Sequence, residues 1–397
     1  MNPDIEKLHR IANKDSRLII GLMSGTSLDG LDIALCEIRG TGHQTHLQLK
    51  AFITQPYTPK FTNRIKQVFS KQSIDQQLLC GLNAQVAQVH ADLVLDALDQ
   101  WDLKPEDIDL IASHGQTVYH APQSLTKNLE LPNSTLQIGD GDHLAVQTGI
   151  ITIADFRQKH VASGGQGAPL ALYGDFLLFS DTEEDRVLLN IGGISNFSFI
   201  PSRKSNMQAF ATDLGPGNTL MNQYMSVHFG LDMDRDASLA SQGQINEKLL
   251  QLLLTEPFLV LPLPKTTGPE LFSYDQLQRQ LQVARLQNLT HADIMATLNR
   301  FTAQTIIDGL SILEKETPDF KLYISGGGLH NPLLMNQLES HFGLALKPLS
   351  VLKMDPDAKE ACLFALLANQ TVSGHPDDFQ HLDGAPAVNM GKICFPY

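Results

Sequence analysis

Near its N-terminus the chain reads Ile19-Ile20-Gly21-Leu22-Met23-Ser24-Gly25-Thr26-Ser27-Leu28-Asp29-Gly30-Leu31-Asp32-Ile33-Ala34-Leu35-Cys36. The apolar residues at either end predict two strands, and the small residues between them predict a tight turn. Backbone N–H groups and three hydroxyls in such a turn could surround a phosphate. Asp29 follows directly, where a carboxylate could hold Mg²⁺ through water. An ordinary hairpin with a polar turn accounts for the same residues equally well.

Composition limits the class of protein. The chain has 397 residues, of which 42% are hydrophobic, enough for two or three domains with a large core. Its net charge of −14 argues against nucleic acid or an anionic membrane as a partner. No signal peptide is evident, and no apolar run approaches the ~18 residues of a membrane span. We therefore expect a cytoplasmic protein with reduced thiols, because its four cysteines are far apart without CxxC spacing: Cys36, Cys80, Cys362 and Cys394.

A second hairpin is predicted over residues 187–200, where Gly192 and Gly193 separate two apolar runs. It repeats the plan of the first hairpin about 170 residues later. Two such hairpins, one in each domain, could hold a polyphosphate from both sides. This internal repeat favours a phosphate site over an ordinary hairpin.

Polar residues follow several other predicted strands. His114 comes after an apolar run at 108–112, and it is either a ligand contact or a residue that fixes a turn. Arg157 comes after a strand at 150–155 and could hold an anion or sugar oxygens, or form a salt bridge between domains. Residues 164–167 are small and precede Pro169, which predicts a hinge or a substrate flap.

Four further segments contain candidate site residues. Asp213 precedes a Gly-Pro-Gly loop and is either a general base or the start of an Asx turn. The three glycines at 326–328 join a strand to a helix, where a ring or a phosphate could approach the backbone. Glu360 opens a helix as an active-site carboxylate or as a partner of the helix dipole. Lys265 and Thr266 lie in a stiff proline-rich loop and could reach a ligand.

Taken together, these motifs resemble the anhydro-N-acetylmuramic acid kinases, which belong to the acetate and sugar kinase/Hsp70/actin superfamily. The resemblance implies an α/β protein with a two-domain actin-like ATPase (ribonuclease H-like) fold. Its mixed sheets would be flanked by helices, with ATP and substrate in the cleft between the domains. The matching stretches are residues 21–32, 113–117, 136–140, 154–157, 164–170, 190–196, 212–218, 264–268 with 270–272, 326–332 and 360–361.

The resemblance also implies a reaction. Such kinases use ATP to phosphorylate O6 of anhydro-N-acetylmuramic acid while water opens the 1,6-anhydro ring. The products are N-acetylmuramic acid 6-phosphate and ADP, in cell-wall recycling. The alternatives are a related kinase for a different sugar and a nucleotide-binding regulatory member of the superfamily.

Roles for individual residues follow from the matching motifs. Asp213 matches the general base, and Arg157 and Glu360 match residues of the catalytic pocket that hold the sugar. Mg²⁺ would bridge the phosphates, with Asp29 as its partner through water. The expected substrate contacts also include His114, Gln116 and Thr117. The expected ATP contacts are Ser24, Gly25, Thr26, Ser27, Asp29 and Gly30 in the first hairpin, Asn190, Gly192 and Gly193 in the second, and Gly326, Gly327 and Gly328 on the adenosine side.

The chain departs from the family pattern at three positions. It has His160 where the family has Asp, Pro269 where the family has Arg, and Asp383 where the family has Thr. Proline cannot replace the bidentate donor that arginine provides. These departures bear on the identity of the sugar.

For the domains, we expect residues 1–135 to form the first and residues 136–370 to form the second. The segment at about 371–397 is expected to return to the first domain. A homodimer is expected by family analogy alone.

Overall fold

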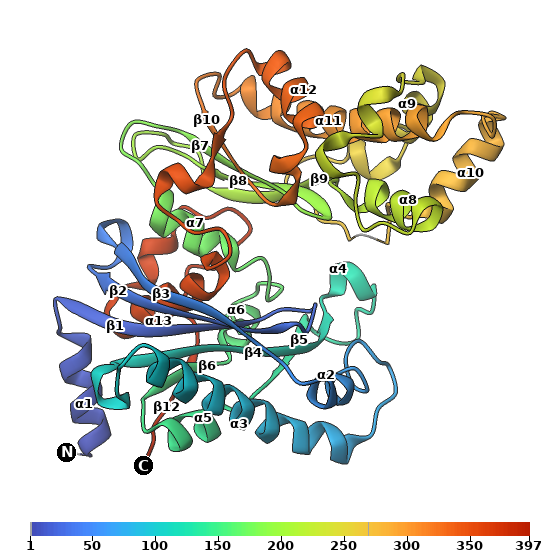
Figure 1. The fold of residues 1–397 in the computed structure, drawn as a ribbon. Helices are drawn as coiled ribbons and strands as arrows, with labels where there is room; N and C mark the ends of the chain where they lie inside the picture. Colours follow the sequence, from blue (N-terminus) through green and yellow to red (C-terminus); the bar gives the residue numbers. More distant parts are fainter. Residues whose placement is uncertain (1, 269) are drawn as a thin grey trace. The chain divides into compact units, whose positions relative to one another are not determined.

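The chain divides into two units in this computed structural model, which describes residues 2–268 and 270–397. Unit 1 comprises Met1–Leu178 and Asp357–Tyr397, and unit 2 comprises Phe179–Pro356. Unit 2 is therefore an insertion in the sequence of unit 1. Each unit contains one β-sheet and its own helices (Figure 1).

The sheet of unit 1 begins with an antiparallel meander of three strands, the first of which also pairs in parallel with β4. β4 in turn pairs in parallel with β6, and its second half pairs antiparallel with β5. From one edge of the sheet to the other, the strands are β12 (Lys392–Cys394), β6 (Thr152–Ala154), β4 (Leu110–Ala121), β1 (Ser16–Ser24), β2 (Gly30–Arg39) and β3 (His46–Pro56), and β5 (Ser134–Ile138) pairs with β4.

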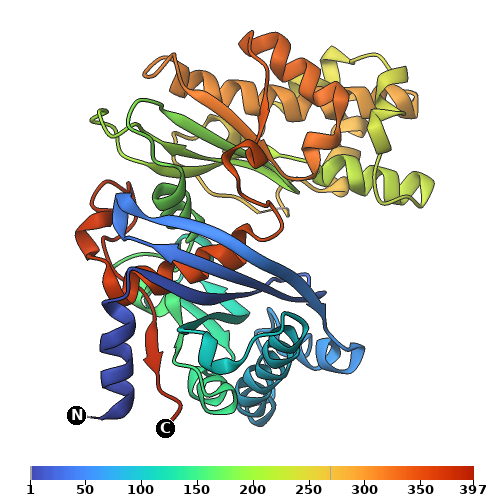
Figure 2. The ribbon, with the colours of Figure 1, turned by 60° about the vertical axis from the view of Figure 1, so that its left-hand side comes forward.

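Helices cover both faces of this sheet (Figures 1 and 2). The long helix α3 (Gln76–Gln100) packs on one face, where Val86 and Val94 share a core with Ile20 and Leu22 of β1. On the opposite face, α13 (Lys359–Ser373) lies against β1 at Gly21, where an added Cβ would come within 1.9 Å of the Ala361 carbonyl oxygen. The other helices of unit 1 are α1 (Pro3–Ala12), α2 (Pro59–Ile65), α4 (Gln123–Thr126), α5 (Gly141–Thr148), α6 (Phe156–Ala162) and α7 (Ala171–Phe179).

The sheet of unit 2 has the same plan. Its first three strands form an antiparallel meander, and β7 also pairs in parallel with β10, which pairs in parallel with β11. The strands are β11 (Lys347–Pro348), β10 (Lys321–Ser325), β7 (Arg186–Ile191), β8 (Ile194–Ile200) and β9 (Phe210–Pro216). The helices are α8 (Thr219–Phe229), α9 (Glu247–Leu253), α10 (Tyr274–Ala284), α11 (His291–Glu314) and α12 (Pro332–Phe342).

The shared strand order shows that the repeat extends beyond the two hairpins. In each sheet the third, second, first, fourth and fifth main strands lie side by side in that order, which is the ribonuclease H-like arrangement. The expected α/β class, with mixed sheets flanked by helices, is confirmed.

The observed division of the chain differs from the domain boundaries expected at residues 135 and 370. Residues 136–178 lie in unit 1, because β6 extends the first sheet and α5 packs on α3. Residues 357–370 also lie in unit 1, because α13 packs on β1. The sequence did not indicate these long-range pairings.

Helix α3 has the length and mean hydropathy of a membrane span, by composition alone. It is the one such helix in the described part of the chain, and the sequence was expected to contain none. Leu82, Val86 and Leu98 of α3 are buried in the core of unit 1, as in a core helix.

Candidate functional site

The turn of the first hairpin, residues 25–29, is built as an exposed loop with one buried anchor. Thr26, Ser27 and Asp29 are exposed, whereas Leu28 is buried and has a φ of 59°. The Ser27 hydroxyl donates to Asp29 Oδ1 at 2.6 Å, and the Gly30 N–H donates to the same oxygen at 3.1 Å. These hydrogen bonds, led by the one from Ser27, lower the pKa of Asp29. An ionised carboxylate beside free backbone and hydroxyl groups suits a cation–phosphate pair.

Two residues expected to contact ligands are instead buried together below this turn. Ser24 Oγ donates to Gln116 Oε1 at 2.5 Å, and both side chains are buried. Gln116 Nε2 donates to the carbonyl oxygens of Gly25 and Thr117, each at 3.2 Å. Neither side chain reaches solvent in unit 1, so both support the turn. Direct ligand contact by Ser24 and Gln116 stays a prediction, and in this structure their side chains are buried and bonded to each other.

The cause of this difference is the length of β4. The sequence predicted a strand that ends at residue 112, but β4 continues to Ala121 because β5 pairs with its second half. His114 and Gln116 are therefore strand residues in the sheet interior. Of the three residues expected to contact the substrate in this segment, only Thr117 is partly exposed.

Arg157 is held by two hydrogen bonds inside unit 1. Its Nε donates to His114 Nε2 at 3.0 Å, and its Nη1 donates to the Gly167 carbonyl oxygen at 2.6 Å. Burial lowers the pKa of Arg157 to about 10, against the opposing effect of Glu360, so the side chain stays charged near neutral pH. Burial and the charge of Arg157 hold the pKa of His114 well below its ordinary value. His114 is thus a neutral acceptor that orients Arg157.

Glu360 lies in the first turn of α13, and its charge interacts with that of Arg157 in α6. Partial desolvation raises the pKa of Glu360, the charge of Arg157 lowers it, and Asp32 raises it further. The residue itself is exposed, so its carboxylate can meet a ligand. The preceding residue, Lys359, pairs with the buried Asp175 of α7 at 2.8 Å and fixes the start of the helix. Arg157 and Glu360 thus lie in the same unit, and each charge shifts the pKa of the other.

His160 explains one departure from the family pattern. It is buried, and its Nδ1 accepts the Gly167 N–H at 2.9 Å. Burial lowers the pKa of His160 to about 4, so the ring is neutral. An aspartate could accept the same backbone N–H, and the histidine therefore replaces it in organising residues 164–167.

In unit 2 the second hairpin turn and the three-glycine segment lie together. Gly326 has a φ of 85°, and a Cβ there would come within 2.7 Å of Asn190 Oδ1. A Cβ on Gly328 would come within 2.3 Å of Ile191 Cγ2. The carbonyl oxygens of Gly192 and Gly193 accept the N–H groups of Asn218 and Gly217, both at 2.8 Å. Two segments expected to bind ATP are therefore adjacent within this unit.

Asp213 lies within β9 and is half-buried. Its Oδ2 accepts the Thr267 N–H at 2.8 Å, and its own N–H donates to the Lys265 carbonyl oxygen at 2.9 Å. Burial raises the pKa of Asp213, while the hydrogen bond from Thr267 lowers it. The described residues include no hydrogen-bond donor to Oδ1, which leaves that oxygen open to accept a proton. No pattern in the sequence indicated that the Thr267 backbone orients this carboxylate.

The remaining described positions singled out in the sequence lie in loops. Lys265 does not reach for a ligand, because its Nζ donates to the carbonyl oxygens of Phe258 and Leu259 at 3.1 and 2.7 Å. Thr266 is exposed, and so is Asp383. Pro269 lies outside the described residues.

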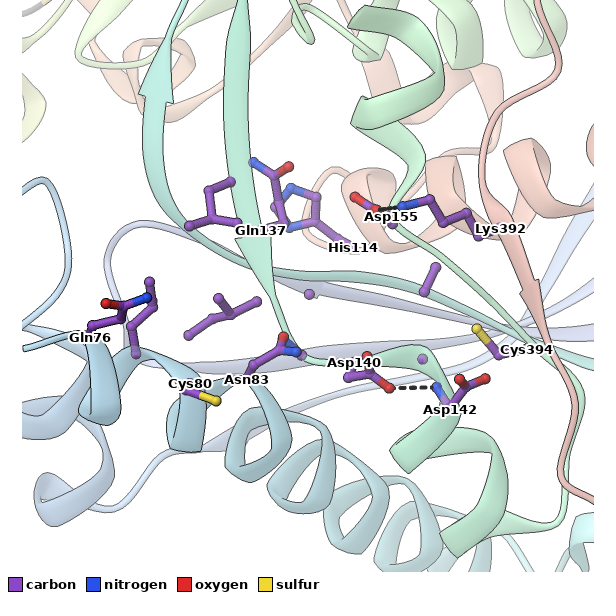
Figure 3. A pocket seen from close by; sticks show the side chains of 17 residues that line it. Gln76, Cys80, Asn83, His114, Gln137, Asp140, Asp142, Asp155, Lys392 and Cys394 are labelled. Atoms are coloured by element: carbon purple, nitrogen blue, oxygen red, sulfur yellow. Dashed lines mark hydrogen bonds and ion pairs between the residues drawn. The ribbon is translucent and has the colours of Figure 1, made fainter. Parts of the chain in front are cut away.

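A cavity of about 470 Å³ opens in unit 1 between α3, the β5–α5 turn and β12 (Figure 3). Asp140, Asp142 and Asp155 line it, and Lys392 pairs with Asp155. Of the residues expected to bind substrate or ATP, only His114 borders it. Its excess of carboxylates does not suit a phosphate or an anionic sugar.

The duplicated sheet and its hairpin turns define the class of two-domain ATPases with actin-like folds. The sequence profile described as anhydro-N-acetylmuramic acid kinase matches residues 17–396. Relatives with that name include one from Pseudoalteromonas atlantica, 49% identical over 400 residues and covering both chains completely. Another, from Caldanaerobacter subterraneus, is 36% identical over 98% of this chain and 100% of its own. The chain belongs to the anhydro-N-acetylmuramic acid kinase family and is an ATP-dependent kinase.

Solved structures show only a distant likeness. A ROK family glucokinase from Streptomyces griseus, in complex with glucose and AMPPNP, is 12% identical with a TM-score of 0.35, over 89% of this chain and 99% of its own. The activator of 2-hydroxyisocaproyl-CoA dehydratase from Clostridium difficile has a TM-score of 0.40 at 12% identity, over 90% and 96% of the two chains. These values are too low to carry an argument about this chain.

Proposed function

We propose that the protein opens the 1,6-anhydro ring of anhydro-N-acetylmuramic acid with water and phosphorylates O6. The observation that carries the proposal is the Asp213 carboxylate, which is half-buried and oriented by the Thr267 N–H. The resemblance of its motif to that of the family supports its assignment as the general base. The products are N-acetylmuramic acid 6-phosphate and ADP.

The reaction couples two bond exchanges. A water oxygen bonds to C1 as the C1–O6 bond breaks, and the water gives one proton to Asp213. O6 bonds to the γ-phosphorus as the bond from the γ-phosphorus to the β-phosphate oxygen breaks. The phosphoryl group thus neutralises the departing oxygen, which ordinarily needs a general acid. One carboxylate base therefore suffices where most glycosidases use two.

The protonation state of Asp213 suits this role. Burial raises its pKa, which makes the ionised carboxylate a stronger base than an ordinary aspartate, and the Thr267 N–H opposes this rise by stabilising the charged form. A positioned base of this kind contributes about 10²–10⁴ in rate. Arg157 and Glu360 bind the sugar, the first as a cation fixed by His114 and the second as an exposed acceptor.

The exposed residues of the first hairpin turn and residues 190–193 of the second bind the phosphates of ATP, and residues 326–328 bind on the adenosine side. Asp29 would hold Mg²⁺ through water, since its lowered pKa and exposed carboxylate fit a hydrated cation. When bound, the ion neutralises phosphate charge.

We place this activity in the cytoplasm, in the recycling of cell-wall sugars. Nucleic acid and membranes are not partners in this proposal, which follows from the net charge of −14. A homodimer is proposed by family analogy, and its measurement is sedimentation of the purified chain.

Turnover in ¹⁸O-labelled water tests the proposal. The purified protein is given ATP, Mg²⁺ and anhydro-N-acetylmuramic acid, and products are weighed by mass spectrometry. We expect a sugar phosphate with one ¹⁸O at C1. Phosphorylation without ring opening removes the role of Asp213 as water base. No sugar phosphate, with ATP still bound, favours a kinase for a different sugar or a regulatory member of the superfamily.

A further inference from the structure

A buried chain of four side chains ends at the first hairpin turn. His90 of α3 is hydrogen-bonded through Nε2 to the Tyr57 hydroxyl at 2.8 Å. The Tyr57 hydroxyl donates to Ser24 Oγ at 2.8 Å, and Ser24 in turn donates to Gln116 Oε1. All four side chains are buried. Neither Tyr57 nor His90 belongs to any motif described above.

The direction of every hydrogen bond in this chain can be deduced. Gln116 Nε2 faces two carbonyl oxygens, so its Oε1 faces Ser24 and can only accept. The Ser24 hydroxyl donates its one hydrogen to Gln116 and must therefore accept from Tyr57. The Tyr57 hydroxyl donates its hydrogen to Ser24 and must therefore accept from His90. His90 therefore carries its hydrogen on Nε2.

The state of His90 agrees with this deduction. Burial lowers its pKa to about 3, so the ring is neutral and has one N–H. Its Nδ1 has no hydrogen-bond partner among the described residues. A hydrogen on Nδ1 would thus be buried and unpaired, which is costlier than an unpaired acceptor.

Tyr57 braces both ends of the turn. Its hydroxyl holds Ser24, which precedes the turn, and its backbone N–H donates to the carbonyl oxygen of Asp29 at 3.1 Å, which ends it. Through Gln116, the same chain also holds the carbonyl oxygen of Gly25. The three contacts fix the turn while Thr26 and Ser27 stay exposed.

We propose that Tyr57 is a positioning residue for ATP, with His90 as the donor that orients it. It acts through Ser24 and Gly25 and touches no substrate. The inference rests on the proposed role of the first hairpin turn in binding the phosphates. Its consequence is specific: loss of the Tyr57 hydroxyl weakens ATP binding and leaves the sugar site intact.

The test compares Tyr57→Phe with Tyr173→Phe. Tyr173 is also buried in unit 1, and its hydroxyl makes one hydrogen bond, at 2.7 Å to the Pro386 carbonyl oxygen. We expect Y57F to raise the KM for ATP and the Kd for a non-hydrolysable ATP analogue about tenfold. The KM for the sugar should stay within about twofold, and Y173F should leave both constants unchanged. Equal constants in Y57F and the wild type overturn the proposal, as does a rise confined to the sugar.

A second pair of variants tests the same chain at its other end. His90→Gln keeps a side-chain N–H donor, whereas His90→Leu removes it. We expect H90L to repeat the effect of Y57F on ATP and H90Q to restore most of the binding. Similar ATP constants in H90L and the wild type contradict the role of His90.

Ser27→Ala separates failure of this inference from failure of the proposed function. It removes the hydroxyl that bonds Asp29 in the exposed turn. If S27A weakens ATP binding and Y57F does not, the turn binds phosphate and Tyr57 does not position it. If an active S27A and Y57F both bind ATP normally, the turn itself is wrongly assigned.

Discussion

Burial disfavours the charged form of Asp213, and the proposed mechanism uses this carboxylate as the base. We expect Asp213→Asn to lower turnover about 10²–10⁴-fold, because the amide cannot take a proton from water. The amide oxygen can still accept the Thr267 N–H, so the fold should persist. Melting temperature and ATP affinity check that the variant is intact. Near-normal turnover would remove Asp213 from the mechanism.

The pH dependence follows from the same carboxylate. The base must be ionised, so activity is present above its pKa and is lost as pH falls through it. Because burial raises this pKa above its ordinary value of 3.8, the acid limb of the kcat profile should lie above that value. Glu360 has a raised pKa as well, so the profile is measured in Glu360→Gln too. A limb that disappears in this variant belongs to Glu360 instead.

His160 gives a prediction about sequence variation. His160→Asp should keep activity, because a carboxylate can accept the Gly167 N–H in place of Nδ1. His160→Phe should fail to hold residues 164–167 and should raise the KM for the sugar, since Gly167 bonds Arg157. Steady-state kinetics of the two variants measure kcat and the KM for the sugar. Equal loss in both would mean that ring shape, and not hydrogen bonding, matters at this position.

At the residue scale, the sequence indicated which polar residues lie at the first hairpin turn, but it did not indicate which of them are exposed. Thr26, Ser27 and Asp29 are exposed as a ligand turn requires, whereas Ser24 is buried. Small polar residues look alike in a sequence whether they face solvent or a buried partner. The partner of Ser24 is Gln116, 92 residues away, and no local pattern predicts that contact.

At the scale of elements, the contact between α13 and β1 depends on the absence of a side chain. We expect Gly21→Ala to destabilise the protein by roughly 1–3 kcal/mol or more, because its Cβ would overlap the Ala361 backbone. The displaced helix carries Glu360, so activity should also fall. Urea unfolding monitored by circular dichroism measures the effect.

Gly81→Ala is the matched control. Gly81 is an exposed residue of α3, and an added Cβ there meets nothing within 4 Å. Alanine in a helix interior is better than glycine by about 0.5–1 kcal/mol, so this variant should be slightly more stable. Equal stability of G21A and the wild type would show that α13 can shift away from β1 without a cost in stability.

Both hairpins were predictable because turns of small residues between apolar runs are local signals. β1, β2, β7 and β8 lie within a few residues of their predicted positions. The end of β4 was not predictable, because it depends on pairing with β5 across a connection of twelve residues, 122–133.

For the whole molecule, ligand binding should be visible as stabilisation. A ligand that binds only the folded chain, at 100 times its Kd, adds about 2.7 kcal/mol to the free energy of unfolding. We expect a non-hydrolysable ATP analogue with Mg²⁺ to raise the melting temperature, and D213N to respond as the wild type does. Thermal shift measures both. No shift in either protein would contradict nucleotide binding under those conditions.

The internal repeat predicted the duplicated architecture but not its boundaries. Similar hairpins at residues 19–36 and 187–200 indicated two related domains, and the two sheets share one strand order. Assigning residues 136–178 needed the pairing of β6 with β4 and β12, which joins segments far apart in the chain. Such pairings leave no periodic signal in a single sequence.

The interruption of unit 1 by unit 2 has a consequence for synthesis on the ribosome. Unit 2 is one continuous segment and can complete its sheet as soon as residue 356 has emerged. Unit 1 must wait, because α13 and β12 are translated last and the face of β1 that receives α13 stays uncovered until then. We therefore expect the inserted half to mature first in vectorial folding. A nascent chain released before residue 359 would carry a finished second half and an unfinished first half, a natural substrate for chaperones.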